Sequence, residues 1–166
     1  MKAFDIMNKD VVVAHPDTAI TDVVDLLIDN NVPAAPVVDE NNKLIGIVTE
    51  GDLLYKKVRP HVPHYVNLLG ATIYYNGISE YDKSFKKLMA ATAADLMTKN
   101  VIVAAPDADI EQLAGVMVTE HLKSIPIVKD GVVLGMVLRR DILRLISTER
   151  ERIQTYINNV EEKTEK

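Results

Sequence analysis

The sequence predicts an α/β protein in which two β-α-β-β-α repeats pack sheet to sheet with pseudo-two-fold symmetry. The first observation is an internal repeat, because residues 5–16 resemble residues 95–106 closely. The second is an apolar helical period that follows each of these stretches, and the third is a hairpin pattern that follows each helix. One copy alone is too small to bury both faces of its sheet, so we expect the two copies to share a core.

Each copy begins with a short strand and an amphipathic helix. In the first copy, residues 11–13 should form a buried strand, and residues 18–30 should form the helix. The helix is predicted because apolar side chains recur at i, i+3, i+4 and i+7. These side chains are Ile20, Val23, Val24 and Leu27 in the first copy and Ile110, Leu113, Ala114 and Met117 in the second.

A hairpin and a further helix complete each copy. Pro36 begins the first strand, where a residue without an amide hydrogen is tolerated; residues 39–43 turn and residues 44–48 return. In the second copy, Asp130 and Gly131 form a strong two-residue turn signal. This copy lacks one residue in the hairpin turn, which a true structural repeat tolerates because turns lie on the surface.

The predicted boundaries are 1–55 for the first repeat and 94–146 for the second. Between them, residues 56–93 do not repeat and are rich in tyrosine, so we expect an ordered insertion packed over the repeat core. Residues 147–166 continue a helix that begins near Arg140 and end in a polar tail. The alternating charges of this helix fit a solvated edge, and its apolar stripe would also fit pairing with a second subunit.

Composition argues against several classes of function. The formal net charge is -5, which disfavours nucleic-acid binding because that requires a concentrated basic face. No apolar run is long enough to cross a membrane and the first residues lack the core of a signal peptide, so we expect a cytoplasmic protein. The absence of cysteine excludes thiol nucleophiles and thiolate zinc sites.

The motifs give no sign of an enzyme or of a metal site. No serine lies in a Gly-x-Ser-x-Gly elbow, and no glycine-rich phosphate loop occurs. Asp52 and Asp141 are expected at separate places, so they do not form an acid–base pair. His61 and His64 have the spacing of metal ligands, but no acidic or histidine partner lies nearby in the sequence. We therefore expect neither catalysis nor a bound metal.

The ordered motifs, present twice, resemble a tandem pair of cystathionine-β-synthase-type (CBS) domains, also called a Bateman module. Each copy contains Asp-(Ile/Leu)-Met, Val-x-Val-x-x-Pro, x-x-Pro-(Val/Ile)-Val and Gly-x-Val-x-x-x-Asp, over residues 4–55 and 94–145. The resemblance implies a regulatory, energy-sensing homodimer that binds AMP, ADP, ATP or S-adenosylmethionine in the clefts between repeats. It implies no further cofactor, and the client protein that would receive the signal is unknown.

The resemblance also implies ligand-binding residues in the first copy. In Gly46-Ile-Val-Thr49-Glu-Gly-Asp52, the carboxylate of Asp52 would hold the ribose hydroxyls and Thr49 would assist. A carboxylate suits this role, because each charge-assisted hydrogen bond is worth roughly 1.5–3 kcal/mol. The remaining positions are an adenine wall before the strand proline and a segment lining the same pocket: Val32, Pro33 and Ala34, then Lys9 and Val11.

The second copy departs from the motif. It keeps the carboxylate of Asp141 but has Leu138 in place of the hydroxyl. Its adenine wall would be Leu122 and Lys123, and the phosphate-binding candidates would be Lys123, Arg139 and Arg140.

Three alternatives stay open at the level of sequence. Thr49 and Asp52 also fit a helix capping box, which can coexist with ribose binding. Arg139 and Arg140 also fit a solvated pair of surface charges. The alternative function is a dimerisation scaffold that binds no ligand, which Leu138 and the amphipathic C-terminal helix favour.

Overall fold

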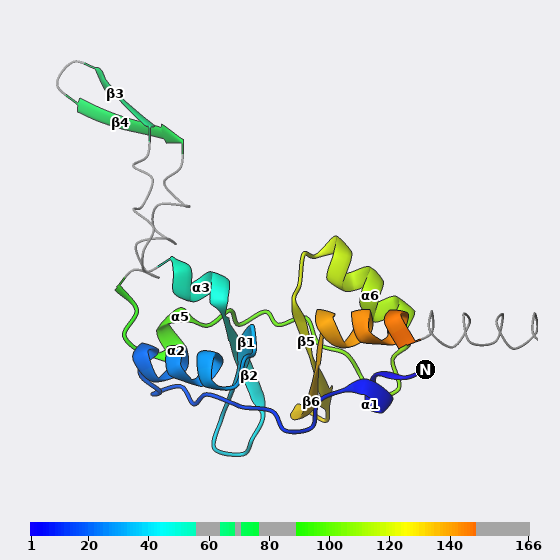
Figure 1. Ribbon diagram of the computed structural model, residues 1–166. Coiled ribbons are helices and arrows are strands. Elements are labelled where there is room, and N and C mark those ends of the chain that lie inside the picture. The colour runs from blue at the N-terminus through cyan, green and yellow to red at the C-terminus, as the bar shows by residue number, and fades with distance from the viewer. Residues whose placement is uncertain (56–63, 69–70, 77–88, 149–166) are drawn as a thin grey trace, which may run out of the picture. The chain divides into compact units, whose positions relative to one another are not determined.

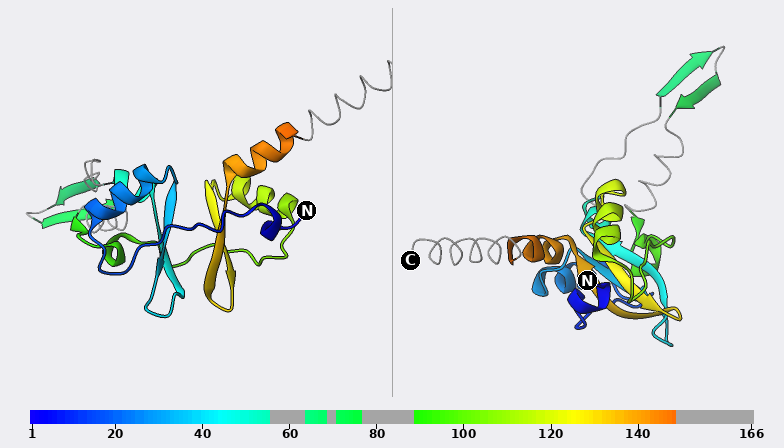
Figure 2. Two further views of the ribbon diagram at one scale, coloured as in Figure 1. Left: turned by 60° about the horizontal axis from the view of Figure 1, so that its bottom comes forward. Right: turned by 90° about the vertical axis from the view of Figure 1, so that its right-hand side faces the viewer.

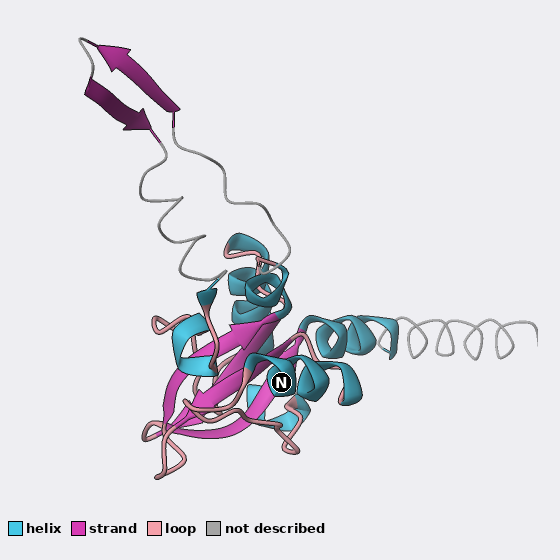
Figure 3. Ribbon diagram, turned by 90° about the vertical axis from the view of Figure 1, so that its left-hand side faces the viewer, coloured by secondary structure: helices cyan, strands magenta, loops and turns pink. Residues whose placement is uncertain are grey.

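The computed structural model describes residues 1–55, 64–68, 71–76 and 89–148, and the chain divides into two compact units (Figure 1). Unit 1 comprises Met1–Val11 and Ile102–Lys166, and unit 2 comprises Val12–Val101. Each unit combines helices with a small antiparallel hairpin, which confirms the predicted α/β class (Figure 3).

Unit 2 contains the long helix, the hairpin and the closing helix of the first repeat in the predicted order. Helix α2 (Ile20–Asp29) precedes the antiparallel strands β1 (Ala34–Val38) and β2 (Leu44–Thr49), and helix α3 (Glu50–Leu54) follows directly. α2 packs against β1 and α3, because its buried residues Ile20, Val23 and Leu27 lie on one side of the helix. This part of the fold follows the apolar period closely.

The predicted strand of residues 11–13 is wrong. Only Ala14 pairs with the sheet, through a parallel bridge to Val37. The amide of Ala14 donates to the carbonyl of Pro36 (2.9 Å), and the amide of Val38 donates to the carbonyl of Ala14 (3.0 Å). One bridged residue fixes this segment beside β1 but is too short to make a strand.

Unit 1 has the same core elements. Helix α6 (Ile110–Thr119) precedes the antiparallel strands β5 (Ser124–Lys129) and β6 (Val132–Leu138), and residues 139–148 are helical. The expected continuation of this last helix beyond residue 148 lies outside the described residues.

The two hairpin turns differ as the missing residue predicts. Asp130 and Gly131 both have positive φ (53° and 83°), as a two-residue hairpin turn with the twist of its strands requires. In unit 2, the longer turn places Asn42 at φ 61°, and the side chain of Asp39 accepts hydrogen bonds from the amides of Asn41 and Lys43 (both 2.9 Å). The residue lost from the second copy is therefore a turn residue.

The boundaries of the compact units differ from those of the sequence repeats, because the N-terminal segment of each repeat belongs to the other unit. Helix α1 (Ala3–Ile6) begins the first repeat, yet it packs on β6 of unit 1 (Figure 2). Helix α5 (Ala93–Leu96) lies at the start of the second repeat and packs on β2 of unit 2. The buried side chains agree, since Ala3 lies in the core of unit 1 and Leu96 lies in the core of unit 2. Each repeat thus supplies the helix that completes the other unit.

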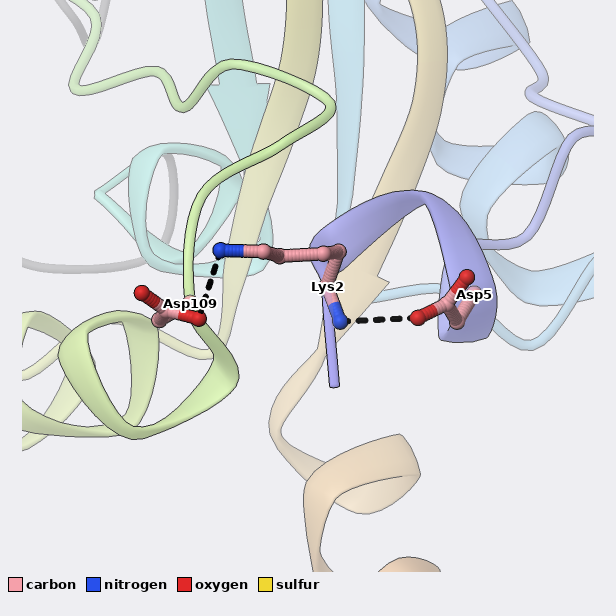
Figure 4. A network of polar contacts seen from close by, with 3 residues as sticks. All are labelled: Lys2, Asp5 and Asp109. Atoms are coloured by element: carbon pink, nitrogen blue, oxygen red, sulfur yellow. Dashed lines mark hydrogen bonds and ion pairs between the residues drawn. The ribbon is translucent and has the colours of Figure 1, made fainter.

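Polar contacts fix α1 within unit 1 (Figure 4). Lys2 Nζ lies 2.8 Å from Asp109 Oδ1, and the Lys2 amide donates to Asp5 Oδ2 (2.8 Å). The hydrogen bond between the two side chains raises the pKa of Lys2 and lowers the pKa of Asp109. The Ala3 amide also donates to the carbonyl of Ala108 (2.9 Å), so backbone and side-chain contacts hold the same segment.

The insertion between the repeats contains an antiparallel hairpin of strands β3 (His64–Leu68) and β4 (Ala71–Asn76). The rest of the predicted insertion, and with it the expected packing over the repeat core, falls outside the described residues. Within the parts of the chain that are described, no helix has the length and apolarity to cross a membrane.

Candidate functional site

Thr49 and Asp52 form a reciprocal capping box at the junction of β2 and α3. The Thr49 amide and hydroxyl both donate to Asp52 Oδ2, at 3.0 and 2.8 Å, and the Asp52 amide donates to Thr49 Oγ1 at 3.2 Å. Thr49 has extended backbone dihedrals (φ -115°, ψ 163°), as an N-cap residue should. The capping alternative from the sequence is therefore present in the structure, and it holds the carboxylate in one orientation.

Asp52 is the buried acidic residue among the described side chains, with 6% of its surface exposed. Burial of a carboxylate is costly unless hydrogen bonds compensate it, and the capping box supplies such bonds. An ionised carboxylate accepts hydrogen bonds only, so its chemical capacity is to bind hydroxyl or amine donors. Neighbouring hydroxyls, such as those of a ribose, match that capacity.

The structure brings the predicted adenine wall to the same place as Thr49. Ala34 pairs with Thr49 in the antiparallel register, and the Glu50 amide donates to the carbonyl of Pro33 (3.0 Å). The Val32 amide donates to the carbonyl of Leu27 (3.1 Å), which anchors the start of this segment to the end of α2. Residues 32–34 and the capping box are thus neighbours within one unit.

In unit 1, the equivalent carboxylate has different surroundings. The Leu138 amide donates to Asp141 Oδ2 (2.9 Å), so the backbone hydrogen bond of the capping box is kept although Leu138 has no hydroxyl. Arg144 Nη1 lies 3.6 Å from Asp141 Oδ1. Leu138 is buried, with 3% of its surface exposed. In unit 1, an apolar side chain therefore stands at the position of the capping hydroxyl, and an arginine lies beside the carboxylate.

Arg139 and Lys123 lie together in unit 1. The Arg139 amide donates to the carbonyl of Lys123 (2.8 Å), as the Glu50 amide does to Pro33 in unit 2. The Arg139 guanidinium donates through Nη2 to the carbonyls of Leu122 (2.7 Å) and Met117 (3.2 Å). The Met117 carbonyl belongs to the last turn of α6 and Leu122 follows this helix, so the guanidinium lies at a helix C-terminus, where the helix dipole favours a cation. Phosphate binding by Arg139, Arg140 or Lys123 stays a prediction.

Lys9 and Val11 belong to unit 1, whereas the capping box belongs to unit 2. The Lys9 ammonium lies 4.3 Å from the centre of the Phe4 ring, a cation–π contact. The residues equivalent to Lys9 and Val11 in the other repeat are Lys99 and Val101, and these share unit 2 with Asp52. The sequence reasoning did not consider Lys99 and Val101, although the repeat offset identifies both positions.

Among the described side chains, no group of three or more His, Cys, Asp or Glu residues is arranged to hold a metal ion. A hollow of about 740 Å³ beside the β1–β2 turn is lined by acidic residues from two segments, Asp17 and Asp22 from one and Asp39 and Glu40 from the other.

Comparison with known proteins identifies the class to which this fold and site belong. The CBS domain family model matches residues 3–59 and 93–148, which together make up more than half of the chain. The chain belongs to the CBS domain family, here as a tandem pair of domains. The repeat pattern predicted this family, and the comparison confirms it.

Among relatives with similar sequences, the uncharacterized protein MJ1426 of Methanocaldococcus jannaschii is 32% identical over 86% of this chain and 89% of its own length. The chloroplastic protein CBSX2 of Arabidopsis thaliana is 27% identical over 80% of this chain and 57% of its own length. The chain is also similar to 20% of the inosine-5'-monophosphate dehydrogenase of Nitrosopumilus maritimus, so it matches only a region of that enzyme.

Two solved structures show the same fold. CBSX2 in complex with AMP has a TM-score of 0.73 and 24% identity, and the match covers 89% of this chain and 97% of that one. The CBS domain pair of protein MJ0100, in complex with 5'-methylthioadenosine and S-adenosyl-L-methionine, has a TM-score of 0.66 and 26% identity. That match covers 90% of this chain and 98% of the MJ0100 chain.

Proposed function

We propose that this protein is a regulatory module that binds an adenosine-containing nucleotide through Asp52 and Thr49 of unit 2. The candidate ligands are AMP, ADP, ATP and S-adenosylmethionine. The observation that carries the proposal is the buried carboxylate of Asp52, oriented by Thr49 and neighboured by residues 32–34 in a CBS fold. The carboxylate would accept from the ribose hydroxyls, and the apolar segment would offer backbone groups and a flat wall to adenine.

The MJ0100 domain pair supports adenosine as the recognised part of the ligand. Its two ligands, 5'-methylthioadenosine and S-adenosyl-L-methionine, differ in charge at sulfur but share adenine and ribose. A site that recognises adenosine needs a hydrogen-bond acceptor for the ribose hydroxyls and an apolar wall for adenine. Unit 2 contains candidates for both. The groups beyond the ribose would then set the choice among nucleotides.

Regulation follows if the ligand binds two arrangements of the protein with different affinity. A ligand shifts such an equilibrium only by its differential affinity for the two states. Binding at micromolar concentration corresponds to about 8 kcal/mol, so a fraction of that energy is enough to move an equilibrium of a few kcal/mol. We expect the module to act as a homodimer in the cytoplasm and to signal to a client protein rather than to catalyse a reaction.

Calorimetric titration with each of the four nucleotides tests the site. Asp52→Asn keeps a side-chain oxygen that can accept from Thr49 but removes the charge that the ribose would use. We expect the affinity for the preferred nucleotide to fall at least tenfold, which corresponds to about 1.4 kcal/mol. Unchanged affinity in Asp52→Asn would remove this carboxylate from the binding site.

A matched control exists within the same unit. Asp95 caps α5 as Asp52 caps α3, since the Thr92 amide and hydroxyl donate to Asp95 Oδ2 at 3.0 and 2.9 Å. Asp95→Asn therefore reproduces the loss of charge in a capping box outside the Gly-x-Val-Thr motif. Nucleotide affinity should stay at the wild-type value in this variant.

A scaffold without a ligand is the second candidate function. The observation in its favour is that Asp52 and Asp141 both serve as helix caps, a role that needs no ligand. A thermal-shift screen separates the two, because a ligand at 100 times its dissociation constant adds about 2.7 kcal/mol of stability. A screen of adenosine compounds that leaves the melting temperature unchanged would favour the scaffold.

A further inference from the structure

The two units contain the same carboxylate in surroundings of different chemistry. Asp52 of unit 2 and Asp141 of unit 1 end equivalent Gly-x-Val-x-x-x-Asp motifs. Four positions within these motifs, or one helical turn after them, differ in kind. With the residue of unit 2 first, they are Thr49 and Leu138, Glu50 and Arg139, Gly51 and Arg140, and Tyr55 and Arg144. Unit 1 therefore has three arginines near Asp141 and lacks the hydroxyl.

Both oxygens of the Asp141 carboxylate lie beside groups of unit 1 itself. Oδ2 accepts from the Leu138 amide at 2.9 Å, and Oδ1 lies 3.6 Å from Nη1 of Arg144. A carboxylate binds ribose hydroxyls by accepting hydrogen bonds, which are strong because the acceptor is charged. The hydroxyls of a ribose would have to compete with Arg144 for this acceptor.

The hydroxyl that orients the carboxylate in unit 2 has no counterpart at the same position of unit 1. Three hydrogen bonds join Thr49 and Asp52, and two of them are made by the Thr49 hydroxyl. The Leu138 amide makes the hydrogen bond to Asp141, and the Leu138 side chain is buried. A site that has to order its side chains on binding loses affinity relative to a preorganised one. Unit 2 is therefore the better prepared of the two.

A backbone acceptor of the expected adenine wall is also engaged in unit 1. The Arg139 guanidinium donates to the carbonyl of Leu122 at 2.7 Å, and Leu122 is the counterpart of Val32 in unit 2. In unit 2, the side chain at the position of Arg139 is the carboxylate of Glu50, which accepts hydrogen bonds and donates none when ionised. In unit 1, the exocyclic amine of adenine would have to compete with Arg139 for the Leu122 carbonyl.

We propose that the motif of unit 1 is a structural cap and not a second ligand site, so that each chain binds one nucleotide, at Asp52 of unit 2. Leu138, Arg139 and Arg144 are the residues that set this number. The inference rests on the proposed function and adds the number of ligands and the residues that determine it.

The three residues act together, because each of them changes one part of the site. The Arg144 side chain is 76% exposed, and an exposed ion pair contributes little by itself. Leu138 removes the hydroxyl but keeps the amide donor, and Arg139 engages one backbone carbonyl. A test by gain of binding therefore has to change all three positions at once.

The test gives unit 1 the residues of unit 2 in one triple variant of the full chain, Leu138→Thr with Arg139→Glu and Arg144→Tyr. Calorimetric titration with AMP and, separately, with S-adenosylmethionine measures the number of ligands bound per chain. We expect one ligand per wild-type chain and two per chain of the triple variant. Two ligands per wild-type chain, one of them retained at full affinity in Asp52→Asn, would overturn the inference and leave the proposed function standing.

A matched control isolates the hydroxyl. Leu138→Val replaces Leu138→Thr in the same triple variant, because valine has the shape of threonine without its hydroxyl. This control should bind one ligand per chain. A second ligand in the valine variant would overturn the role assigned to the hydroxyl. Asp141→Asn, added to the threonine variant, should remove the second binding event and leave the first.

The outcomes separate this inference from the proposed function. No binding of any of the four nucleotides to the wild-type chain would overturn both. A single wild-type event that weakens in Asp141→Asn and not in Asp52→Asn would overturn both assignments of the carboxylates. Urea unfolding shows whether the triple variant is folded. A folded triple variant that binds the same single ligand as the wild type would overturn the role of the three residues.

Discussion

The side chain of Met97 lies against Gly46 so closely that a Cβ at position 46 would come within 2.8 Å of the Met97 Cγ. Met7 takes the same place over Gly135, where a Cβ would come within 2.7 Å of the Met7 Cγ. The Asp-x-Met motif at the start of one repeat therefore packs on the Gly-x-Val motif of the other. The glycine recurs in both copies because a methionine occupies the space of its side chain.

Gly46→Ala and Gly135→Ala should therefore destabilise the protein, each by about 1–3 kcal/mol, as overpacking of a filled core does. The cost at position 135 should be larger, because its Cβ would also meet the Asn8 carbonyl oxygen at 2.9 Å, and backbone yields less than a methionine side chain. Urea-induced unfolding at equilibrium measures both values.

Gly115→Ala is the matched control for these two substitutions. A Cβ at Gly115 meets nothing within 4 Å, and the residue lies inside α6. Alanine in a helix interior is favoured over glycine by roughly 0.5–1 kcal/mol, so this variant should be more stable than the wild type. Destabilisation by Gly115→Ala equal to that of Gly46→Ala would contradict the packing explanation.

His121→Gly should stabilise unit 1. His121 ends α6 with a positive φ of 54°, and Asn31 ends α2 in the same way with a φ of 50°. The following amides, from Leu122 and Val32, reach back to carbonyls in the last turn of each helix, as in a Schellman motif. Left-handed backbone costs an L-residue roughly 1–2 kcal/mol. Glycine avoids this steric cost but loses more conformational entropy on folding, so the expected net gain in stability is about 0.5–1 kcal/mol.

Asn31→Gly provides the comparison for that variant. Asparagine tolerates the left-handed region better than histidine, so the gain at position 31 should be smaller. Thermal unfolding of both variants checks the order. A larger gain for Asn31→Gly than for His121→Gly would show that the backbone conformation does not control stability at these positions.

Most of the local fold could be predicted from sequence because its signals are local. The apolar period located α2 and α6, and Asp130-Gly131 located a turn whose positive φ values only such residues adopt readily. The adjacency of Thr49 and Asp52 also followed, since three residues separate them on a strand-to-helix junction. Each of these inferences needs only the chain within a few residues.

The exchange of N-terminal segments could not be predicted in this way. The stretches that contain Met7 and Met97 are nearly alike, so no local pattern decides which hairpin each one joins. The family resemblance groups Lys9 and Val11 with Asp52; the first two lie in unit 1 and Asp52 lies in unit 2, and their role in ligand binding stays a prediction. The cap formed by Arg139 was not predicted either, because two adjacent basic residues have the same sequence pattern whether they bind phosphate or backbone carbonyls.

Lys2→Met should change how stability depends on pH. The hydrogen bond with Lys2 lowers the pKa of Asp109 from its ordinary value of 3.8, so its stabilisation is present above that value and is lost as pH falls through the lowered pKa. The same contact raises the pKa of Lys2 from 10.5, so its stabilisation is present below that value and is lost as pH rises through the raised pKa.

The difference in unfolding free energy between wild type and Lys2→Met should therefore be constant near neutral pH and should shrink at both extremes. The pair is half exposed, so the difference should be small and should decrease in high salt. Urea unfolding across the acid range measures it. A difference that persists below the lowered pKa of Asp109 would show that Lys2 acts through packing.

Arg139→Ala distinguishes a helix cap from a phosphate-binding residue. As a cap, the Arg139 guanidinium stabilises the carbonyls of Leu122 and Met117, so the variant should lose about 1 kcal/mol of stability while its nucleotide affinity stays unchanged. As a phosphate ligand, Arg139 would instead contribute to the affinity for ATP more than for S-adenosylmethionine, which carries no phosphate. Arg140→Ala is the neighbouring comparison. Calorimetry of both variants with ATP and with S-adenosylmethionine gives four affinities, and urea unfolding gives the two stabilities. A selective loss of ATP affinity in Arg139→Ala would contradict a purely structural cap.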